Sequence, residues 1–295
     1  MHKTALALAA AAALVSTGAL AQATAADVVV LMDESGSMAG EQAWIPNTIN
    51  LLNIGLLGAG LTDNRYGLVG FSASAASAPS RVRSFPVGGG QFGTPAEFAA
   101  AAAGLQVTGG TEDGYAAIAH ANTYAFNAAS ARNFILVTDE DRDNTNVALT
   151  FDNILAGLLS SNTLLNAVVN ASFRCSSDNS VALGIIGTTG YKANGTGGFT
   201  TCANATFGAG AGNTVDDYVD LALASGGGAW DLSILRAGGI NAESFTKAFV
   251  AGKIDEIITQ VPGIPEPETY ALMLAGLGAV GWVARRRKAG ASAKA

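Results

Sequence analysis

A run of apolar β-formers that ends in acidic and hydroxyl side chains constrains the fold of this 295-residue chain more than any other feature. The run is Val28-Val29-Val30-Leu31-Met32, and it continues directly into Asp33-Glu34-Ser35-Gly36-Ser37. Valine-rich runs of this length are typical of central parallel strands that are covered on both faces. Gly36 allows a sharp turn, so Ser35 and Ser37 are expected to face the same side as Asp33. Hard divalent cations prefer such oxygen ligands, although a turn with a serine helix cap uses the same residues.

Two further segments place polar side chains at the ends of predicted elements. Thr108-Gly109-Gly110-Thr111 precedes a helix-like run, and Phe134 to Thr138 is a buried strand that leads into Asp139. In an open α/β sheet, ligands bind outside the carboxyl ends of the strands, where loops from several strands meet. The sequence therefore predicts that these polar side chains gather at one edge of a sheet.

Together these segments resemble the von Willebrand factor type A family, whose metal-ion-dependent adhesion site combines Asp-x-Ser-x-Ser with a distant threonine and a distant aspartate. The resemblance implies five metal ligands in this chain, namely Asp33, Ser35, Ser37, Thr111 and Asp139. In the family, the serine hydroxyls and often the threonine touch the metal, whereas the aspartates frequently act through water. The implied cofactor is a divalent cation, with magnesium expected first and manganese or calcium as alternatives.

Two neighbouring acidic features have no place in this ligand set. Glu34 occupies the variable position of the motif, and its carboxylate is expected to point away into solvent. The segment from Asp139 to Asn144 looks like the start of a calcium-binding loop, but an EF-hand needs glycine at Asn144 and glutamate at Thr150. We therefore expect a solvated acidic loop after Asp139, with a second, weak cation site as the alternative.

Predicted strands and helices alternate along the chain. Helical spacing predicts a helix from Ala43 to Leu57, and the other expected helices are Pro95 to Ala103, Asp113 to Phe126, Val147 to Ser161, Val215 to Ala224 and Ser244 to Gln260. After the first strand, the expected strands are Tyr66 to Phe71, Arg81 to Val87, Arg132 to Thr138 and Leu164 to Val169, and Ala229 to Leu235 is a short segment. This alternation predicts an α/β fold with a doubly wound, mostly parallel central sheet and helices on both faces, similar to Rossmann folds. The type A resemblance makes residues 27–260 one domain.

Cys175 and Cys202 are the only two cysteines. In an exported protein, an even pair most simply forms a disulfide. The bond would close a loop of 27 residues and contribute about 3.5 kcal/mol in the chain-entropy model. The enclosed segment has one short strand signal, Val181 to Ile186, followed by a stretch rich in Gly, Thr and Asn. We expect it to leave the sheet as an excursion that is pinned at its base.

The first 21 residues have the order of a secretory signal peptide. Met1-His2-Lys3 precedes an apolar run, Ala5 to Val15, and Ala19-Leu20-Ala21 supplies small residues for cleavage. We expect export by the Sec route and a mature chain that starts at Gln22. A second possible cleavage site is Ala23-Thr24-Ala25.

The other end of the chain carries a second address. Residues 261–268 form a linker that contains Pro265-Glu266-Pro267, and residues 270–288 join an apolar stretch to Arg285, Arg286, Arg287 and Lys288. This order resembles the PEP-CTERM sorting signal of Gram-negative bacteria, which is recognised by an exosortase, a membrane-embedded transpeptidase-like enzyme. Roughly 15 apolar residues span about 22 Å as a helix, less than a hydrocarbon core of about 30 Å. The positive-inside rule keeps the basic cluster cytoplasmic. We expect transient anchoring in the inner membrane followed by processing, with a permanent single-span anchor as the alternative.

The chain between these two addresses is strongly acidic. The whole sequence has 16 Lys and Arg against 23 Asp and Glu. Six of the basic residues and two of the acidic residues lie in the terminal segments, which leaves a net charge of −11 between them. Because phosphate binding needs basic patches, we expect no nucleic-acid partner. Divalent cations and basic partners suit this charge better.

Few residues favour an enzyme. His120 is the only histidine of the expected mature chain, and the sequence contains neither a Gly-x-Ser-x-Gly turn nor a P-loop. A structural role is expected for His120, with a Ser-His-Asp triad as the alternative. A hydrolase that uses the metal to activate water needs a base, for which only Glu34, Glu112 and Asp141 are suitably placed.

These features predict a non-enzymatic binding module at the cell surface or in an extracellular matrix or biofilm. The type A resemblance implies a metal that takes an acidic side chain from a partner as its last ligand. The expected partner is therefore a carboxylate-bearing protein or an acidic polysaccharide. A structural matrix protein whose metal only stabilises the fold is the alternative, and a metal-dependent hydrolase is a further one.

Overall fold

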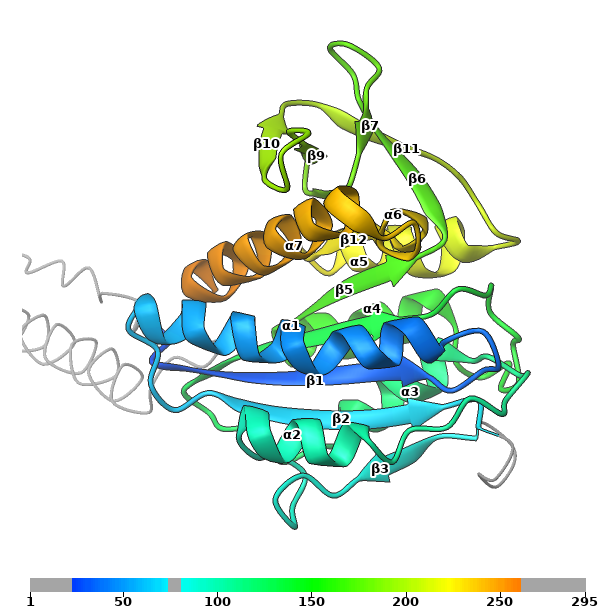
Figure 1. Cartoon of the computed structure of the whole chain (residues 1–295). Helices are drawn as coiled ribbons and strands as arrows, with labels where there is room; N and C mark the ends of the chain where they lie inside the picture. Colours follow the sequence, from blue (N-terminus) through cyan, green and yellow to red (C-terminus); the bar gives the residue numbers. More distant parts are fainter. Residues whose placement is uncertain (1–22, 74–80, 261–295) are drawn as a thin grey trace, which may run out of the picture. The chain divides into compact units, whose positions relative to one another are not determined.

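A nine-stranded sheet forms the centre of the structure, a computed structural model that describes residues 23–73 and 81–260 (Figure 1). Strand β1 (Ala25–Asp33) lies inside this sheet, and all of its residues are buried. Val28 and Val30 pack into one hydrophobic core, whereas Val29 and Leu31 pack into a second core on the opposite face. The continuous apolar run is thus explained by burial on both faces. Asp33 ends the strand at the edge where the candidate ligand loops begin.

Six strands have the order of a doubly wound sheet, β3-β2-β1-β4-β5-β12. Their bounds, besides those of β1, are Arg83–Phe85 (β3), Arg65–Phe71 (β2), Ser130–Val137 (β4), Thr163–Val169 (β5) and Gly228–Asp231 (β12). Every neighbouring pair from β2 to β12 is parallel, and only the short edge strand β3 is antiparallel. The predicted α/β fold class is therefore confirmed. Its switch point lies between β1 and β4, where a doubly wound sheet binds ligands.

Helices cover both faces of this sheet (Figure 1). One face packs against α1 (Ala39–Gly58), α2 (Pro95–Ala102), α6 (Leu232–Arg236) and α7 (Gly239–Thr259). The other face packs against α3 (Gly114–Ala121), α4 (Phe151–Ser160), the π-helical turn η1 (Val215–Val219) and α5 (Asp220–Ala224). Local signals set some of these boundaries. Helix α2, for example, begins at a capping box of Thr94 and Glu97 with Pro95 in its first turn.

Several helices differ in extent from the prediction. Helices α1 and α7 begin before Ala43 and Ser244, at Ala39 and Gly239, because polar and glycine residues in their first turns hide the apolar spacing. Helix α3 ends at Ala121 instead of Phe126, since the chain turns at Asn122. The expected helix from Val215 to Ala224 is divided into η1 and α5. None of these changes moves a candidate ligand to another edge of the sheet.

The segment around the two cysteines is more regular than the expected excursion. Strands β8 (Gly184–Ile186), β9 (Thr189–Ala193) and β10 (Phe199–Cys202) extend the main sheet beyond β12 through antiparallel pairs. Strands β6 (Ala171–Cys175), β7 (Val181–Ala182) and β11 (Ala205–Gly210) form a separate three-stranded sheet. Glycine, which has low β-propensity, stands in β8, β9 and β11, and β7 and β8 are only two and three residues long, so the sequence gives little signal for these strands.

The terminal predictions fall on residues outside the described ranges. These are the signal peptide (1–21) with its cleavage site before Gln22, the linker with Pro265-Glu266-Pro267 (261–268), and the hydrophobic helix with its basic tail (270–288). Across residues 23–73 and 81–260, none of the helices has the length and hydropathy needed to cross a membrane.

Candidate metal centre

Asp33 is the centre of the candidate site, and donors from two neighbouring strands hold its carboxylate. Oδ1 accepts hydrogen bonds from the Ser35 backbone N–H at 2.7 Å and from the Ser72 hydroxyl, just after β2, at 2.8 Å. Oδ2 accepts one from the Thr138 hydroxyl, just after β4, at 2.7 Å. Burial raises the pKa of Asp33 to about 6, while these donors act in the opposite direction. The carboxylate is thus fixed in place by neutral groups only.

Three other predicted ligands form a chain of oxygen atoms beside the motif. The Ser35 and Ser37 hydroxyls are 3.2 Å apart. Ser37 in turn donates a hydrogen bond to Oδ1 of Asp139 at 2.9 Å. The structure therefore brings together residues from the end of β1 and the end of β4 that are 102 positions apart in the sequence. An all-oxygen set of hydroxyls and carboxylates is the donor chemistry that a hard divalent cation prefers.

Thr111 belongs to a loop that packs directly against the motif. The backbone N–H groups of Thr108 and Gly109 both donate to the Glu34 carbonyl at 3.0 Å, and Gly109 forms a parallel bridge with Ser35. Gly109 is required here because a Cβ atom would lie 2.0 Å from the Ser72 carbonyl oxygen. The Thr111 side chain itself is half-buried and, within the described residues, makes no hydrogen bond to the other four predicted ligands. Its loop reaches the site, but its hydroxyl does not join the oxygen chain.

Glu112, which follows Thr111, adds a second buried carboxyl group near Asp33. Its backbone N–H donates to Oδ2 of Asp143 at 3.1 Å. Burial and the neighbouring charge of Asp33 raise the pKa of Glu112 to about 8. Two carboxyl groups whose ionised form is disfavoured by burial therefore lie near the end of β1.

Most buried carboxylates in the described residues have their own cation. Nine Asp and Glu residues are buried, and six of them pair with an arginine or a lysine. The three without such a partner are Asp33, Glu112 and Asp231. Asp231 caps α6 by accepting the Ser233 backbone N–H. Asp33 and Glu112 therefore stand out as adjacent buried acids without a protein cation, at a position where an external cation would compensate their charge.

Arg236, a residue that the sequence analysis missed, closes one side of the site. It lies at the end of α6 and donates to Oδ2 of Asp139 at 2.7 Å, to Oε1 of Glu41 at 2.6 Å and to the Ser37 carbonyl at 3.2 Å. Both oxygens of Asp139 are thus occupied, one by Ser37 and one by Arg236. No local pattern marks Arg236, because its partners are nearly 100 and 200 positions away in the sequence.

The expectation that Glu34 points into solvent is wrong. Glu34 is fully buried and forms an ion pair with Arg83, whose Nε donates to Oε2 at 2.8 Å. Its Oε1 accepts the Gln106 backbone N–H at 2.7 Å. Gly70 provides the space, because a Cβ atom there would lie 2.2 Å from Glu34 Oε2. Glu34 therefore anchors the motif to β3 and to the loop before Thr108, and it is too fully engaged to act as a base.

In the loop after Asp139, Glu140 and Asp143 are exposed, as expected for a solvated acidic loop, and only its basic residue is buried. Arg142 is buried and donates to Oδ1 of Asp113 at 2.8 Å, with its guanidinium over the Tyr115 ring. Among residues 23–73 and 81–260, no group of three or more His, Cys, Asp and Glu side chains is arranged to hold a metal. The alternative of a second cation site in this loop thus gains no support from the geometry.

His120 lies outside this site. Its Nε2 is 2.7 Å from the Ser84 hydroxyl, and burial lowers its pKa. In the described part of the chain, no carboxylate contacts the imidazole, so the orienting third member of a triad has no counterpart there.

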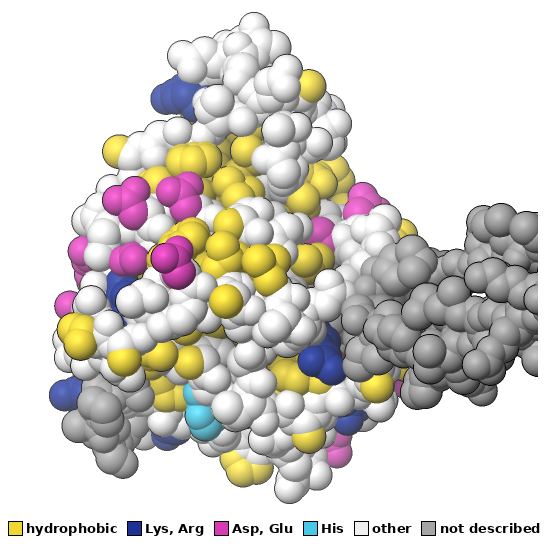
Figure 2. All heavy atoms as spheres, turned by 180° about the vertical axis from the view of Figure 1, so that it is seen from behind, with side chains coloured by type: hydrophobic (Ala, Val, Ile, Leu, Met, Phe, Trp, Pro, Cys, Tyr) yellow, Lys and Arg dark blue, Asp and Glu magenta, His cyan; other side chains and the backbone are white. Residues whose placement is uncertain are grey.

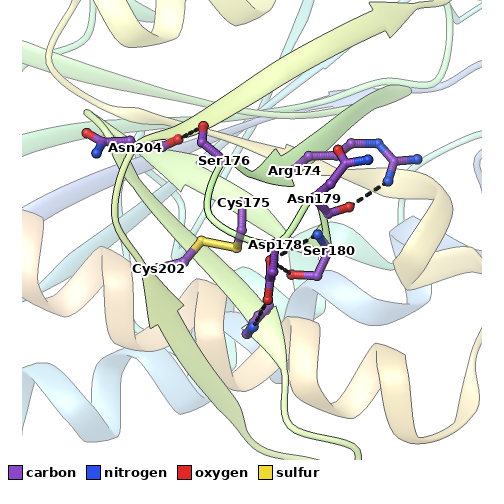
Figure 3. The surroundings of a disulfide bond; sticks show 9 residues. Arg174, Cys175, Ser176, Asp178, Asn179, Ser180, Cys202 and Asn204 are labelled. Atoms are coloured by element: carbon purple, nitrogen blue, oxygen red, sulfur yellow. Dashed lines mark hydrogen bonds and ion pairs between the residues drawn. A yellow bond between two sulfur atoms is a disulfide. The ribbon is translucent and has the colours of Figure 1, made fainter.

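The two cysteines form a disulfide that joins the end of β6 to the end of β10 (Figure 3). It therefore ties the small sheet to the outer strand of the main sheet. Gly190 allows this approach, because a Cβ atom there would lie 2.7 Å from Cys202 Sγ. Close by, Asp178 accepts hydrogen bonds from Ser180 and pairs with Lys192 at 2.8 Å.

Acidic side chains are also prominent on the surface. Figure 2 shows Asp and Glu side chains gathered around hydrophobic ones on the left of this face, with Lys and Arg only scattered. Acidic side chains on this face attract cations.

A comparison with protein-family models supports one part of the sequence analysis. Residues 263–288 match the PEP-CTERM protein-sorting motif, which confirms the predicted C-terminal address. The motif marks an exported protein that is anchored transiently in the membrane and recognised by an exosortase-type processing enzyme. A search of curated proteins found no match.

Solved structures similar to this chain include one matrix protein and one von Willebrand factor type A protein. One is proximal thread matrix protein 1 from the mussel byssus, with 14% identity over 49% of this chain and 35% of that chain, at a TM-score of 0.35. The other is a von Willebrand factor type A protein from Catenulispora acidiphila, with 19% identity over 49% of this chain and 33% of that chain, at a TM-score of 0.33. The chain spans about a third of the length of both structures.

Proposed function

We propose that this exported chain is a cation-dependent binding module, not an enzyme. The proposed site holds a divalent cation, magnesium before manganese or calcium, with Asp33, Ser35, Ser37, Thr111 and Asp139 as ligands. The metal would supply a positive centre that accepts a carboxylate from a partner. The partner is a carboxylate-bearing protein or an acidic polysaccharide at the cell surface or in the extracellular matrix of a Gram-negative bacterium.

One observation carries this proposal: Asp33 and Glu112 are buried, lie close enough for the charge of Asp33 to affect the pKa of Glu112, and have no Lys or Arg partner among the described residues. Burying an ionised carboxylate without a partner is unfavourable, and most other buried acids of the chain avoid that situation by pairing with arginine or lysine. Hydroxyl groups from Ser35 and Ser37 lie close to the same strand end. Together they provide the mixture of hydroxyls and few carboxylates that suits magnesium.

The partner's carboxylate is favoured by the charge of the proposed site. A cation held by neutral hydroxyls and few direct carboxylates keeps part of its positive charge, and it therefore attracts an anionic ligand. Arg236 lies at the rim of the same site and is about one-third exposed, so it offers a second positive group to an incoming carboxylate.

A structural matrix protein is the second candidate, because the same metal would also stabilise the loops without any partner. The two candidates differ in the effect of Thr111→Ala. Thr111 makes no hydrogen bond to the other proposed ligands within the described residues, so its loss should leave the fold intact. Under the binding hypothesis, the variant folds normally but binds a carboxylate partner at least about tenfold more weakly.

The test uses the purified full-length chain and two immobilised probes, poly-L-glutamate and polygalacturonate, with magnesium or EDTA. The binding hypothesis predicts magnesium-dependent retention on at least one probe, lost in Thr111→Ala and kept in the matched control Thr123→Ala. Thr123 is remote from the site, and within the described part of the chain its hydroxyl donates to the His120 carbonyl alone. A Thr111→Ala protein that merely unfolds at a lower temperature in magnesium, without any retention of the unmodified chain on either probe, would favour the structural candidate.

A further inference from the structure

Three helices end at the edge of the sheet that lies opposite the candidate metal centre. Helices α1, α4 and α7 run against the direction of the parallel strands, so their last turns lie where these strands begin (Figure 1). After α1, the Thr62 backbone N–H donates to the Thr24 carbonyl at 3.2 Å. After α7, the Gln260 side chain donates to the carbonyls of Arg132 in β4 and of Asn162, between α4 and β5. We call this side, formed by the starts of β1, β4 and β5 and the ends of the three helices, the basal edge.

Large apolar side chains are exposed near the basal edge on two of these helices. In the last two turns of α1, Leu51, Ile54 and Leu57 are 38%, 57% and 47% exposed, and their spacing of three residues makes them neighbours on the helix surface. In the last turn of α4, Leu159 is 57% exposed. The earlier turns of these two described helices expose no large apolar side chain, and their exposed polar residues are Asn47, Asn50, Asp152 and Asn153. Apolar exposure on α1 and α4 is therefore confined to the turns next to the basal edge.

The same helix ends carry no charged side chains. The sequence contains no Asp, Glu, Lys or Arg from Gln42 to Thr62, and the last turn of α4, residues 157–160, contains none either. This is unusual, because the solvent-facing side of a helix is ordinarily polar and its carboxyl end is stabilised by a basic residue. The fully exposed charged residues near these helix ends, Asp63 and Asp255, are acidic. The exposed apolar side chains therefore suit an uncharged or zwitterionic surface and not a polyanion.

The position at which the chain leaves the domain indicates which surface this is. The described residues end at Gln260, on the basal edge, and the apolar stretch of the sorting signal begins at Tyr270. Fully extended, the chain between these two residues covers at most about 35 Å. A bilayer that holds the sorting signal is therefore present at a high effective concentration beside the basal edge. The candidate metal centre, by contrast, is separated from this edge by the length of β1, about 30 Å.

We propose that the basal edge rests on the lipid surface while the sorting signal anchors the chain, with Ile54, Leu57 and Leu159 inserted into the interface. Ile54 lies about 6 Å along the helix from the end of α1, within the depth of about 5–10 Å that interfacial side chains reach. Because α1 and α4 cover opposite faces of the sheet, a flat bilayer meets both helix ends only when the sheet stands on its edge. In this orientation the candidate metal centre faces away from the membrane, although the inference does not depend on metal binding.

Fluorescence quenching by lipid tests this orientation. Both native cysteines are in the disulfide, so one introduced cysteine carries a bimane label at a single position. The full-length chain is reconstituted in phosphatidylcholine vesicles that contain brominated lipid, and only protein that floats with the vesicles is measured. Quenching of bimane at Leu57→Cys and Leu159→Cys is expected to be at least about threefold stronger than at the controls Asn47→Cys and Asp152→Cys, on earlier turns of the same helices. Quenching no stronger than in these controls, or stronger at only one of the two helix ends, would overturn the proposal.

A combined variant separates contact by these side chains from mere proximity through the linker. With bimane at Ala59→Cys, directly after α1, changing Ile54, Leu57 and Leu159 together to Gln is expected to reduce lipid quenching by at least about twofold. All three side chains are exposed, so the fold should be kept, which circular dichroism checks. The matched control, Val147→Gln, removes an apolar side chain that is 80% exposed near the opposite edge of the sheet and should leave quenching unchanged. Equal quenching in the combined variant and the control would mean that the linker alone holds the domain near the lipid, which contradicts the proposed contact.

Discussion

The two ends of strand β1 each carry a buried aspartate, and the two are treated in opposite ways. Asp27, near the amino end, is fully buried and receives both Nε and Nη2 of Arg65, at 2.9 and 2.5 Å. Asp33, at the carboxyl end, is equally buried but receives only hydroxyl and backbone donors. The same residue type on the same strand is therefore neutralised by the protein in one place and left negative in the other.

This contrast indicates that Asp27 has a structural role and that Asp33 belongs to a binding site. Asp27 also accepts a hydrogen bond from the Asn127 backbone N–H at 2.7 Å. Its role is therefore to hold the loop before β4 at the edge of the sheet where β1 begins. At the switch-point edge, Asp33 and Glu112 have no internal cation, and burial disfavours the ionised form of both. A buried group that destabilises the protein unless something binds to it is a marker of a binding site.

We expect the largest difference between the two aspartates in the free energy of unfolding after each is changed to asparagine. Asp27→Asn leaves the buried side of Arg65 without its carboxylate and is expected to lower the free energy of unfolding by about 2 kcal/mol. This is less than for a fully buried pair, because Arg65 is about one-third exposed. Asp33→Asn, in EDTA at pH 8, is expected to lower it by less than about 0.5 kcal/mol or to raise it, since a buried charge is removed. Urea unfolding of both variants measures this difference. Equal losses of unfolding free energy would contradict the claim that the protein neutralises Asp27 but not Asp33.

The pH dependence of the metal-free chain should sharpen the comparison. Asp33 and Glu112 have pKa values raised from 3.8 to about 6 and from 4.5 to about 8. Groups with raised pKa values hold their protons more tightly in the folded state, so their contribution to stability is complete below about pH 4 and is lost as pH rises toward 8. In EDTA, the chain should therefore become less stable between about pH 4 and pH 8. Asp33→Asn should flatten the part of this slope between about pH 4 and pH 6.

Metal binding should reverse that trend, because the cation displaces the protons. The apparent magnesium affinity is expected to rise by up to about tenfold per pH unit near pH 6, with proton release. Calorimetry in two buffers of different ionisation enthalpy measures the released protons. An affinity that stays constant from pH 5 to pH 8 would exclude Asp33 and Glu112 from the binding equilibrium.

A smaller effect is expected at Arg236, the cation beside Asp139. Arg236→Gln removes a positive charge that repels a bound cation, so magnesium affinity should increase by about threefold to fivefold. Arg174→Gln, a change of the same kind on the small sheet, serves as the control and should have no effect. A weaker magnesium affinity in Arg236→Gln would instead mean that orientation of Asp139 by the guanidinium outweighs the repulsion.

The sequence predicts the local parts of this site well. The apolar run, the turn at Gly36 and the strand before Asp139 are all short-range patterns, and they correctly predict the fold class and the edge where these side chains meet. The same short-range patterns do not predict ion pairs between elements that are distant in the sequence. Glu34 was expected in solvent because nothing near it in the sequence predicts Arg83, which reaches it only after β3 pairs with β2.

The extension of the sheet was hidden for a related reason. Strands β8 and β9 each contain a glycine that allows close packing, namely Gly184 beside Trp230 and Gly190 beside the disulfide. Glycine in a sequence predicts a loop, and only the packed structure reveals that these glycines allow close approach. Arg236 shows the same limit, since its role depends on the position of α6 over the end of β1.

The most direct test of the account is a calorimetric titration of the full-length chain with magnesium, manganese and calcium. The account predicts one-site binding that is weakened at least about 100-fold by Asp33→Ala and is unchanged by Asp63→Ala, which removes an exposed carboxylate at the opposite edge. If the folded chain gives no heat with any of the three metals, or if the two variants bind alike, then Asp33 is not a metal ligand and the contrast between the two ends of β1 has another cause.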